Sequence, residues 1–170
     1  MQMTEPIVNR VAQSNILTLN LEQYYPEGAR VFFDLQPFLF MGMILKEKDF
    51  REALKNHDWT TYAHQHVAVG CSNDAIIQLW AYMLVVSYLQ PHAASVLCGS
   101  LEGLEMVLWQ NALKGIELEN YRNMRVVLKG CGEKQIPPVA YGEASRLLLP
   151  FVKSLMYGEP CSTVPIYKAK

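Results

Sequence analysis

The chain has 170 residues, a formal net charge of −1 and an apolar fraction of 51%. A chain of this length can bury a core without disulfides or a structural metal, and its apolar content excludes a largely disordered protein. Because the basic residues are scattered and no uninterrupted apolar stretch reaches about 20 residues, neither nucleic-acid binding nor a membrane span is expected.

The chain starts with MQMTEPIVNRVAQSN, which lacks the basic region and apolar centre of a secretory signal. We therefore expect a cytoplasmic location. Since thiols are kept reduced in the cytoplasm, no disulfide framework is expected from the cysteines.

The N-terminal third of the chain predicts two strands and a helix. Residues 16–21 alternate apolar and polar side chains, which indicates a half-buried, peripheral strand, and residues 30–35 predict a second strand. Residues 46–56 predict a helix in which Phe50 and Leu54 form an apolar pair on one face.

From residue 66 onward, short apolar runs alternate with helical patterns. Buried strands are predicted at 67–70, 95–98 and 125–129, and helices at 75–89, 101–113 and 139–156, with a break near Pro150. This order predicts an α/β fold of three layers, in which a mostly parallel open sheet has helices on both faces, as in flavodoxin-like and Rossmann-like proteins, with an extra N-terminal strand. Apart from this alternation, no repeat of solenoid length is present.

We expect a single α/β domain over residues 1–170. It would consist of N-terminal strands and a helix (1–60), a βα core (66–156) and an irregular tail (157–170). The helix at 75–89 is apolar nearly all round, so that the face turned away from the sheet needs a second cover. A homodimer supplies that cover, and the N-terminal segment is the alternative.

Common catalytic and nucleotide-binding motifs are absent. The sequence holds no phosphate-binding loop, no dinucleotide-binding glycine pattern, no C-x-x-C, no H-E-x-x-H and no G-x-S-x-G. Motifs alone therefore leave open whether the protein is an enzyme.

The four cysteines are the main candidates for chemistry. Cys71, Cys98 and Cys131 end or follow predicted strands, and ligands of open α/β sheets bind at the carboxyl ends of strands. Cys71 precedes a predicted helix N-terminus, which would favour its thiolate, and Cys131 lies between glycines that allow close approach of a ligand. Cys98 is predicted to be a core residue. Cys161 lies in an irregular, proline-bounded segment that is typical of sites.

Three thiolates and one carboxylate are a candidate ligand set for a metal centre. Cys71, Cys131 and Cys161, with Asp74 or Glu159, can hold zinc or an iron–sulfur cluster. The last predicted helix, however, should carry Cys161 to the opposite edge of the sheet. Either the break at Pro150 turns the chain back, or Cys161 completes the cleft of a neighbouring subunit.

Five segments resemble a bacterial family that is catalogued as domain of unknown function 2480: YYPEGARVFFDL, ILKEKDFREALKNHDW, CSNDAIIQLWAYML, VLKGCG and SLMYGEPCSTVPIYK. The resemblance covers essentially the whole chain and implies no established activity. We expect genes of this family to neighbour iron–sulfur assembly genes. The resemblance therefore implies a role in cluster or sulfur handling, with iron–sulfur assembly proteins as partners.

Three hypotheses follow. The first is a cytoplasmic accessory protein that binds metal through thiolates or handles sulfur. The second is a non-enzymatic, homodimeric interaction module whose cysteines are structural. The third is a thiol enzyme that acts on a small carbonyl substrate.

Overall fold

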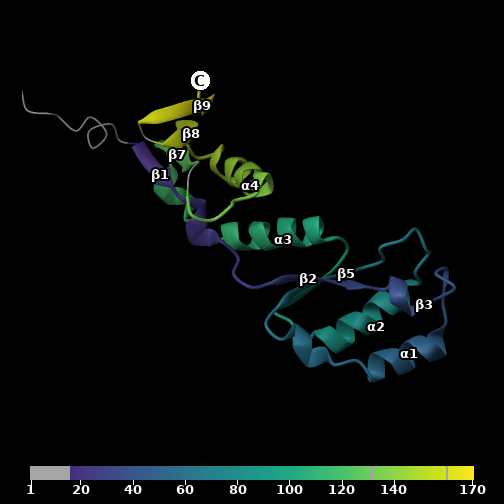
Figure 1. Cartoon of the computed structure of the whole chain (residues 1–170). Coiled ribbons are helices and arrows are strands. Elements are labelled where there is room, and N and C mark those ends of the chain that lie inside the picture. Colours follow the sequence, from purple (N-terminus) through teal and green to yellow (C-terminus); the bar gives the residue numbers. More distant parts are fainter. Residues whose placement is uncertain (1–15, 131, 160) are drawn as a thin grey trace, which may run out of the picture. The chain divides into compact units, whose positions relative to one another are not determined.

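The computed structural model describes residues 16–130, 132–159 and 161–170, which group into two compact units (Figure 1). Unit 1 consists of the described residues up to Pro26 together with Trp109–Lys170, and unit 2 consists of Glu27–Leu108. The predicted α/β class with mostly parallel strands is confirmed. The strands are divided among sheets of four, three and two strands, whereas the sequence predicts one open sheet.

Unit 2 is built on a parallel sheet with the order β2-β5-β6. These strands are Arg30–Asp34, His66–Gly70 and Ser95–Cys98, and a small hairpin is formed by β3 (Leu39–Phe40) and β4 (Ile44–Leu45). Helices α1 (Glu47–Lys55) and α2 (Leu79–Leu89) lie on one side of the sheet, and α3 (Leu101–Leu113) lies on the other (Figure 1). Short 3-10 helices η2 (Gln36–Phe38) and η3 (Trp59–Tyr62) connect these elements.

The core of unit 2 is rich in aromatic side chains. Phe33 of β2 is buried between Phe38 and Trp59, whose ring centroids lie 5.7 and 5.4 Å from its own. Phe50 and Leu54 of α1 are buried in the same cluster, which confirms the predicted apolar pair. On the other side of the sheet, Ala68, Leu104 and Leu108 form a smaller cluster beneath α3.

Unit 1 contains a four-stranded sheet with the order β1-β7-β8-β9. The strands are Ile16–Leu19, Arg125–Lys129, Ser154–Glu159 and Ser162–Lys168, and only β9 is antiparallel to its neighbour. Helix α4 (Pro138–Leu148) and the 3-10 helices η1 (Leu21–Tyr24) and η4 (Leu118–Tyr121) complete the unit. Trp109, which is buried, packs edge-to-face against Tyr25 at 5.8 Å.

Two boundaries differ from the predicted ones. Helix α2 begins at Leu79 rather than at residue 75, because residues 71–78 form a loop that Asn73 stabilises through hydrogen bonds. Helix α4 ends at Leu148, two residues before Pro150, a residue that lacks the N–H a helix interior needs. The predicted helix over 149–156 and the predicted irregular tail are therefore wrong, since these residues include β8 and β9.

Both units contain the same succession of elements, displaced along the sequence by 59 positions. The pairs η3/η4, β5/β7, α2/α4 and β6/β8 begin at residues 59 and 118, 66 and 125, 79 and 138, and 95 and 154. Their strand registers also correspond, because His66 lies opposite Ser95 and Arg125 lies opposite Ser154. The sequence retains identities at this displacement, among them Tyr62/Tyr121, Tyr82/Tyr141 and Pro91/Pro150.

Backbone hydrogen bonds repeat with the same displacement. His64 N–H donates to the carbonyl of His92 at 3.1 Å, and Asn123 N–H donates to that of Phe151 at 2.8 Å. His64 and Asn123 both adopt the left-handed conformation, with φ values of 60° and 59°. Because non-glycine residues rarely adopt this conformation, its recurrence at matched positions identifies an internal duplication.

The first strands of the two sheets belong to the duplication as well. Asn20, after β1, accepts a hydrogen bond from the N–H of the residue two positions on, and Asp34, at the end of β2, does the same. The next residues, Leu21 and Leu35, are both buried. Each unit thus combines one strand from the N-terminal part of the chain with a repeated strand–helix–strand segment.

Among the described helices, none has both the length and the apolar character required to cross a bilayer.

The alternation of faces in β4 gives a direct test of the core. Leu45 is 4% exposed and the adjacent Ile44 is 57% exposed. We expect Leu45→Ala to lower the free energy of unfolding by about 2–5 kcal/mol, because it leaves a cavity, and Ile44→Ala to change it by about 0.5 kcal/mol or less. Urea denaturation followed by circular dichroism measures both values. Equal losses in the two variants would contradict this packing.

Candidate functional site

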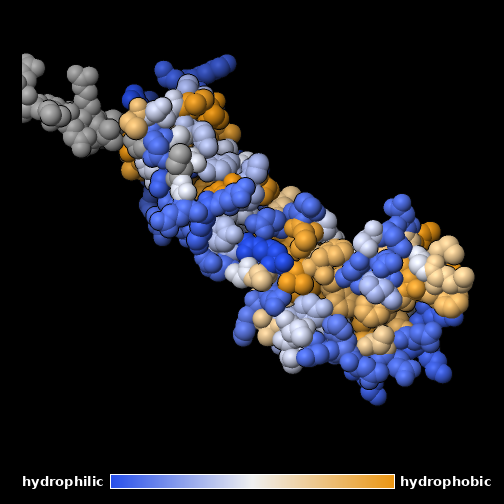
Figure 2. All heavy atoms as spheres, in the orientation of Figure 1, coloured by the Kyte–Doolittle hydropathy of each residue, from blue (hydrophilic) through white to orange (hydrophobic). Residues whose placement is uncertain are grey.

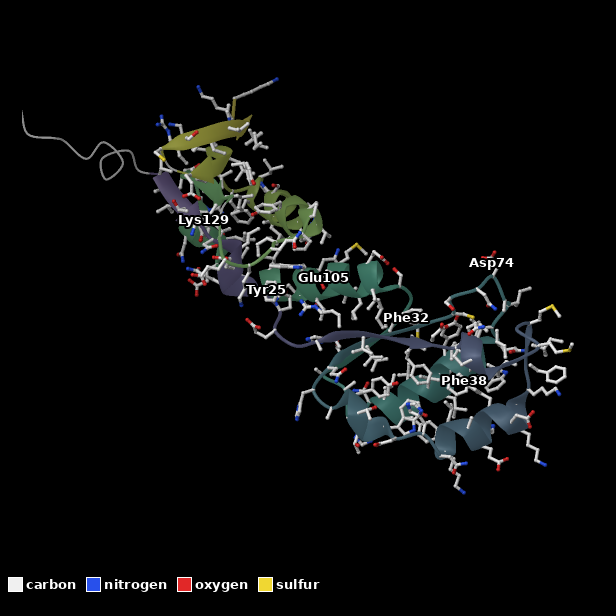
Figure 3. All side chains as sticks on the ribbon, in the orientation of Figure 1. Tyr25, Phe32, Phe38, Asp74, Glu105 and Lys129 are labelled. Atoms are coloured by element: carbon white, nitrogen blue, oxygen red, sulfur yellow. The ribbon has the colours of Figure 1, made fainter. Side chains whose placement is uncertain are left out.

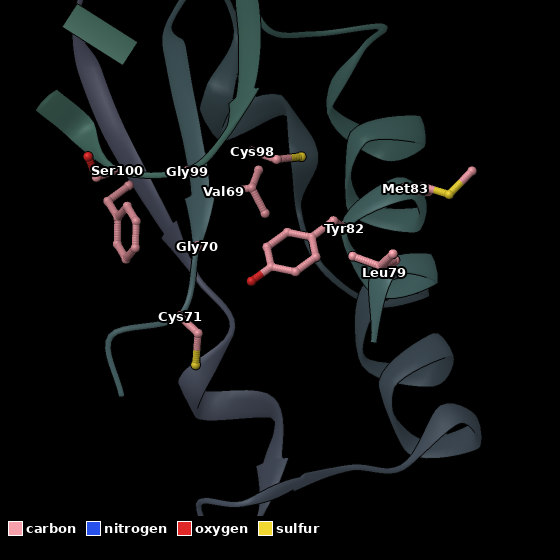
Figure 4. Close-up of a pocket in the computed structure, with 10 residues that line it drawn as sticks. Val69, Gly70, Cys71, Leu79, Tyr82, Met83, Cys98, Gly99 and Ser100 are labelled. Carbon is pink, nitrogen blue, oxygen red and sulfur yellow. The ribbon is translucent and has the colours of Figure 1, made fainter. Parts of the chain in front are cut away.

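A cleft of about 590 Å³ opens at the carboxyl ends of β5 and β6 in unit 2 (Figure 4). Its walls are mostly apolar and include Val69, Leu79 and Met83. Cys71, Cys98 and Tyr82 also line it. The location agrees with the general rule that ligands of parallel sheets bind beyond the carboxyl ends of the strands. We refer to it as the unit 2 cleft.

Close backbone approach shapes the floor of the unit 2 cleft. A Cβ atom on Gly70, the last residue of β5, would lie 2.8 Å from ring atoms of Phe32 and 3.0 Å from the carbonyl oxygen of Gly99. Only glycine fits between the neighbouring strands at this point. The chain can therefore turn from β5 directly into the loop that carries Cys71.

Cys71 is half-buried, and a turn around Asn73 fixes its position. The Cys71 thiol donates a hydrogen bond to Oδ1 of Asn73 at 3.0 Å, and the same oxygen accepts the N–H of Ala75 at 3.1 Å. Nδ2 of Asn73 in turn donates to the carbonyl of Gly42 at 2.9 Å. The predicted helix N-terminus beside Cys71 is absent, since α2 begins only at Leu79, and a helix dipole acts only within its first turn.

Cys98 is not the core residue that the sequence predicts. It is the last residue of β6, lies opposite Val69 of β5 and is exposed. Partial burial raises the pKa of its thiol. In Figure 4 the Tyr82 ring lies between the two cysteines, and the pKa of Tyr82 is raised mainly by burial and also by the negative charge of the two thiolates. Two thiols, one at the end of β6 and one in the loop directly after β5, therefore line one cleft.

Asp34 connects the end of β2 to the loop that follows β5. Its Oδ1 accepts the N–H of Gln36 at 2.9 Å and the N–H of Ser72 at 3.0 Å. Burial acts to raise the pKa of Asp34, but hydrogen bonds from Ser72 and from the Gln36 backbone outweigh it and lower that pKa. The ionised carboxylate thus holds the loop next to Cys71 in place.

Asp74, a predicted metal ligand, faces a different hollow from Cys71. It lines a separate depression together with Gly42, Met43 and Ile76. Figure 3 shows it near the tip of the loop between β5 and α2. The structure therefore does not bring Asp74 into the unit 2 cleft.

Glu159 and Cys161 belong to unit 1, at the carboxyl end of β8. Lys129 of β7 lies opposite Gly158 of β8, and Gly130 N–H donates to the Gly158 carbonyl at 3.3 Å. The chain thus turns back after Pro150, which was one of the two predicted alternatives, and Cys161 follows the edge where β7 also ends. Cys161 is exposed. Oε1 of Glu159 is buried and has no hydrogen-bond partner among the described residues.

Cys131 lies outside the described residues. Of the other predicted ligands, Cys71 and Asp74 are in unit 2, and Glu159 and Cys161 are in unit 1. Within residues 16–130, 132–159 and 161–170, no group of three or more His, Cys, Asp or Glu side chains is arranged to hold a metal ion. A metal site that uses these five residues stays a prediction.

Unit 1 has two smaller hollows at the corresponding sheet edge. One, of about 360 Å³, is lined by Glu22, Lys129 and Lys134, and the other, of about 460 Å³, is lined by Leu128 and Ile166. Tyr141 and Tyr157 line both. The Lys134 N–H, which donates to the Glu22 carboxylate at 2.6 Å, is the main cause of a lowered pKa at Glu22, and Asn20 adds to it.

Sequence reasoning did not identify the tyrosines that line these spaces, which are Tyr82, Tyr141 and Tyr157. Tyr82 lies in the predicted helix at 75–89, which is apolar nearly all round, so that no pattern distinguishes it from its neighbours. Alignment of the chain with itself at a displacement of 59 positions pairs Tyr82 with Tyr141 and would have indicated them. This displacement exceeds the repeat length of a typical solenoid, about 20–50 residues.

The Asp34 contacts predict a pH-dependent stability. Because its pKa is lowered in the fold, Asp34 contributes stability above the pKa of an unfolded aspartate, about 3.9, and this contribution is lost as the pH falls through the folded-state pKa. We expect Asp34→Asn to lower the free energy of unfolding at pH 7 and the difference from the wild type to shrink below about pH 4. Urea denaturation at a series of pH values measures this, with Asp74→Asn as the exposed control. A constant difference down to pH 3 would contradict the assignment.

Comparison with known proteins finds one family. The family model of DUF2480, described as "Protein of unknown function", matches residues 5–169. No curated protein and no solved structure matches the chain. Since the match extends over nearly the whole length, the chain belongs to the DUF2480 family.

Proposed function

We propose that this chain is an accessory protein that handles a soft metal ion or sulfur through its cysteine thiols. One observation carries the proposal: Cys71, which directly follows β5, and Cys98, which ends the neighbouring parallel strand β6, both line the solvent-reachable unit 2 cleft. Thiolates are preferred ligands of zinc and of iron–sulfur clusters, and a pair of thiols can also transfer sulfur or electrons.

The surroundings of the two thiols are consistent with such a role. Asn73 holds the Cys71 sulfur at one position, so that little reorganisation is needed when a ligand binds. Leu79 and Met83 provide an apolar wall on one side of the cleft.

A tetrahedral metal site needs further ligands in addition to these two. We propose that a second copy of the chain supplies them, through Cys131, Cys161 or Glu159. Glu159 offers a carboxylate oxygen that has no other partner among the described residues. Iron–sulfur assembly proteins are the partners that this role suggests.

Metal content after anaerobic purification tests the proposal. We expect bound zinc, or iron with visible charge-transfer absorption, in the wild type, and its loss in Cys71→Ser and Cys98→Ser because thiolate ligands are removed. Elemental analysis and absorption spectra measure both. Asp74→Asn is the matched control and should retain the metal, since Asp74 faces a separate hollow. Metal-free wild type whose cysteines also fail to accept sulfur from a persulfide donor would contradict the proposal.

A second candidate function is a homodimeric interaction module. It is favoured by an apolar surface around the start of α2, where Ile76, Leu79 and Met83 are 88%, 79% and 72% exposed. Apolar (orange) surface is visible on unit 2 in Figure 2. Exposed apolar patches of this kind mark interaction sites on many proteins.

The dimer hypothesis predicts a change in oligomeric state. Leu79→Glu combined with Met83→Glu should convert a dimer to a monomer without loss of folding, because both side chains point away from the core. Light scattering coupled to size-exclusion chromatography measures the mass, and Ser87→Glu, at another exposed position of α2, is the control. A wild type that is monomeric at every concentration would contradict this hypothesis.

A further inference from the structure

The internal duplication allows the sheet edges of the two units to be compared position by position. At a displacement of 59, Val69, Tyr82 and Met83 of the unit 2 cleft correspond to Leu128, Tyr141 and Gly142 of unit 1. The two thiols also have counterparts: Cys98 corresponds to Tyr157, and Cys71 corresponds to Gly130. The same place in the fold therefore carries two cysteines in one unit and a tyrosine with a glycine in the other.

In unit 1, the Tyr157 ring occupies the space between these positions. Its centroid lies 5.5 Å from that of Tyr141, and the two ring planes form an angle of 81°, which is a favourable edge-to-face pair. The far end of the ring reaches Gly130, because a Cβ atom built there would lie 2.8 Å from Cζ of Tyr157. The Tyr157 ring can therefore take this position only because residue 130 is a glycine and has no side chain.

Tyr157 also divides the available space. It lines both unit 1 hollows. The unit 1 residues that correspond to the lining of the unit 2 cleft are divided between these two hollows. In unit 2 the small side chain of Cys98 replaces the ring, and a single cleft of about 590 Å³ results. This volume lies within the range of about 300–1,000 Å³ that is typical of small-molecule sites.

Tyr82 corresponds to Tyr141, but unit 2 has Cys98 in place of the second ring of the pair, Tyr157. In unit 1, the hydroxyl of Tyr141 donates to the carbonyl of Lys129 at 3.1 Å. The hydroxyl of Tyr82 makes no hydrogen bond to any residue that the structure describes. Within the described part of the chain, the unit 2 cleft therefore offers, on one side chain, an aromatic ring without a ring partner and a hydroxyl group without a hydrogen-bond partner.

We propose that the unit 2 cleft binds a small molecule with a phenol-like aromatic ring, which packs against Tyr82 as Tyr157 packs against Tyr141. The Tyr157 ring lies too close to residue 130 for a side chain to fit there, and Cys71 is the corresponding residue in unit 2. The ring of a ligand is not attached to β6, so it can lie farther from the Cys71 side chain. Apolar walls with a few polar groups, here the Tyr82 hydroxyl and the two thiols, are the usual composition of such a site. This ligand is independent of a metal ion, so the inference goes beyond the proposed function although both use one cleft.

The test uses p-cresol, which is the side chain of tyrosine as a free molecule, with the full chain kept reduced and free of metal by a chelator. We expect saturable shifts of the Met83 methyl signal in NMR spectra, with a Kd of about 1 mM, as befits a ligand of this size. The saturated analogue 4-methylcyclohexanol should bind at least about fivefold more weakly, because it cannot form the aromatic pair. No saturable shift with p-cresol, or equal affinity for the two probes, overturns the proposal.

A double variant that copies unit 1 provides the matched control. Cys71→Gly with Cys98→Tyr should weaken p-cresol binding by about tenfold or more, because the new ring takes the place of the ligand. Ser87→Tyr, at an exposed position of α2 that does not line the unit 2 cleft, should leave binding unchanged. Unchanged binding in a folded double variant overturns the proposal.

Thiol protection in the wild type gives a second measurement that needs no variant to fold. p-Cresol should slow the alkylation of Cys98 and leave that of Cys161 in unit 1 unchanged, and equal effects on both cysteines contradict the proposal. The p-cresol experiments use metal-free protein. Their outcome therefore does not depend on whether the wild type contains a metal when it is purified.

Discussion

The structure of each unit depends on one central strand that is buried on both faces. Val67, Ala68 and Val69 of β5 are 0% exposed, as are Val126 and Val127 of β7. Such a strand is stable only between two neighbouring strands and beneath cover on both sides. In each unit the two neighbours of this strand are parallel to it, so the carboxyl ends of these three strands meet at one edge. The cleft of unit 2 and the hollows of unit 1 follow from this arrangement.

Duplication explains why the two edges are alike in shape and differ in chemistry. The backbone plan is shared down to individual hydrogen bonds and left-handed residues. Two substitutions change the result, because a tyrosine opposite a glycine closes the space in unit 1, and two cysteines leave it open in unit 2. Unit 1 also has β9 paired with the edge of β8, whereas β6 has only β5 as a neighbour within the described sheet. The cleft at the carboxyl ends of β5 and β6, where Cys98 takes the place of the Tyr157 ring and β6 has one edge unpaired within the described sheet, is therefore the better place for a ligand.

Much of the secondary structure was predictable, because its signals are local. The predicted segments 95–98, 101–113 and 125–129 match β6, α3 and β7, since short apolar runs and flanking glycines mark their ends. Residues 75–77 are apolar but precede the helix, because Asn73 binds the backbone in a turn that hydrophobicity does not reveal. The exposure of Cys98 depends on which element covers the sheet edge, which is a tertiary property. The division of the parallel strands between the four-stranded and the three-stranded sheet likewise depends on strand pairing between distant segments, for which the sequence contains no local signal.

Unit 2 lies between the two segments of unit 1 along the chain, and this has a consequence for the order of events during synthesis. All residues of unit 2 have left the ribosome once Leu108 has emerged, so it can fold while translation continues. By contrast, Ile16 must wait for Arg125, its partner in β7, and contacts of such long sequence separation form slowly. The nascent β1 strand therefore stays without its partner until β7 has been made, and unit 1 is completed after unit 2.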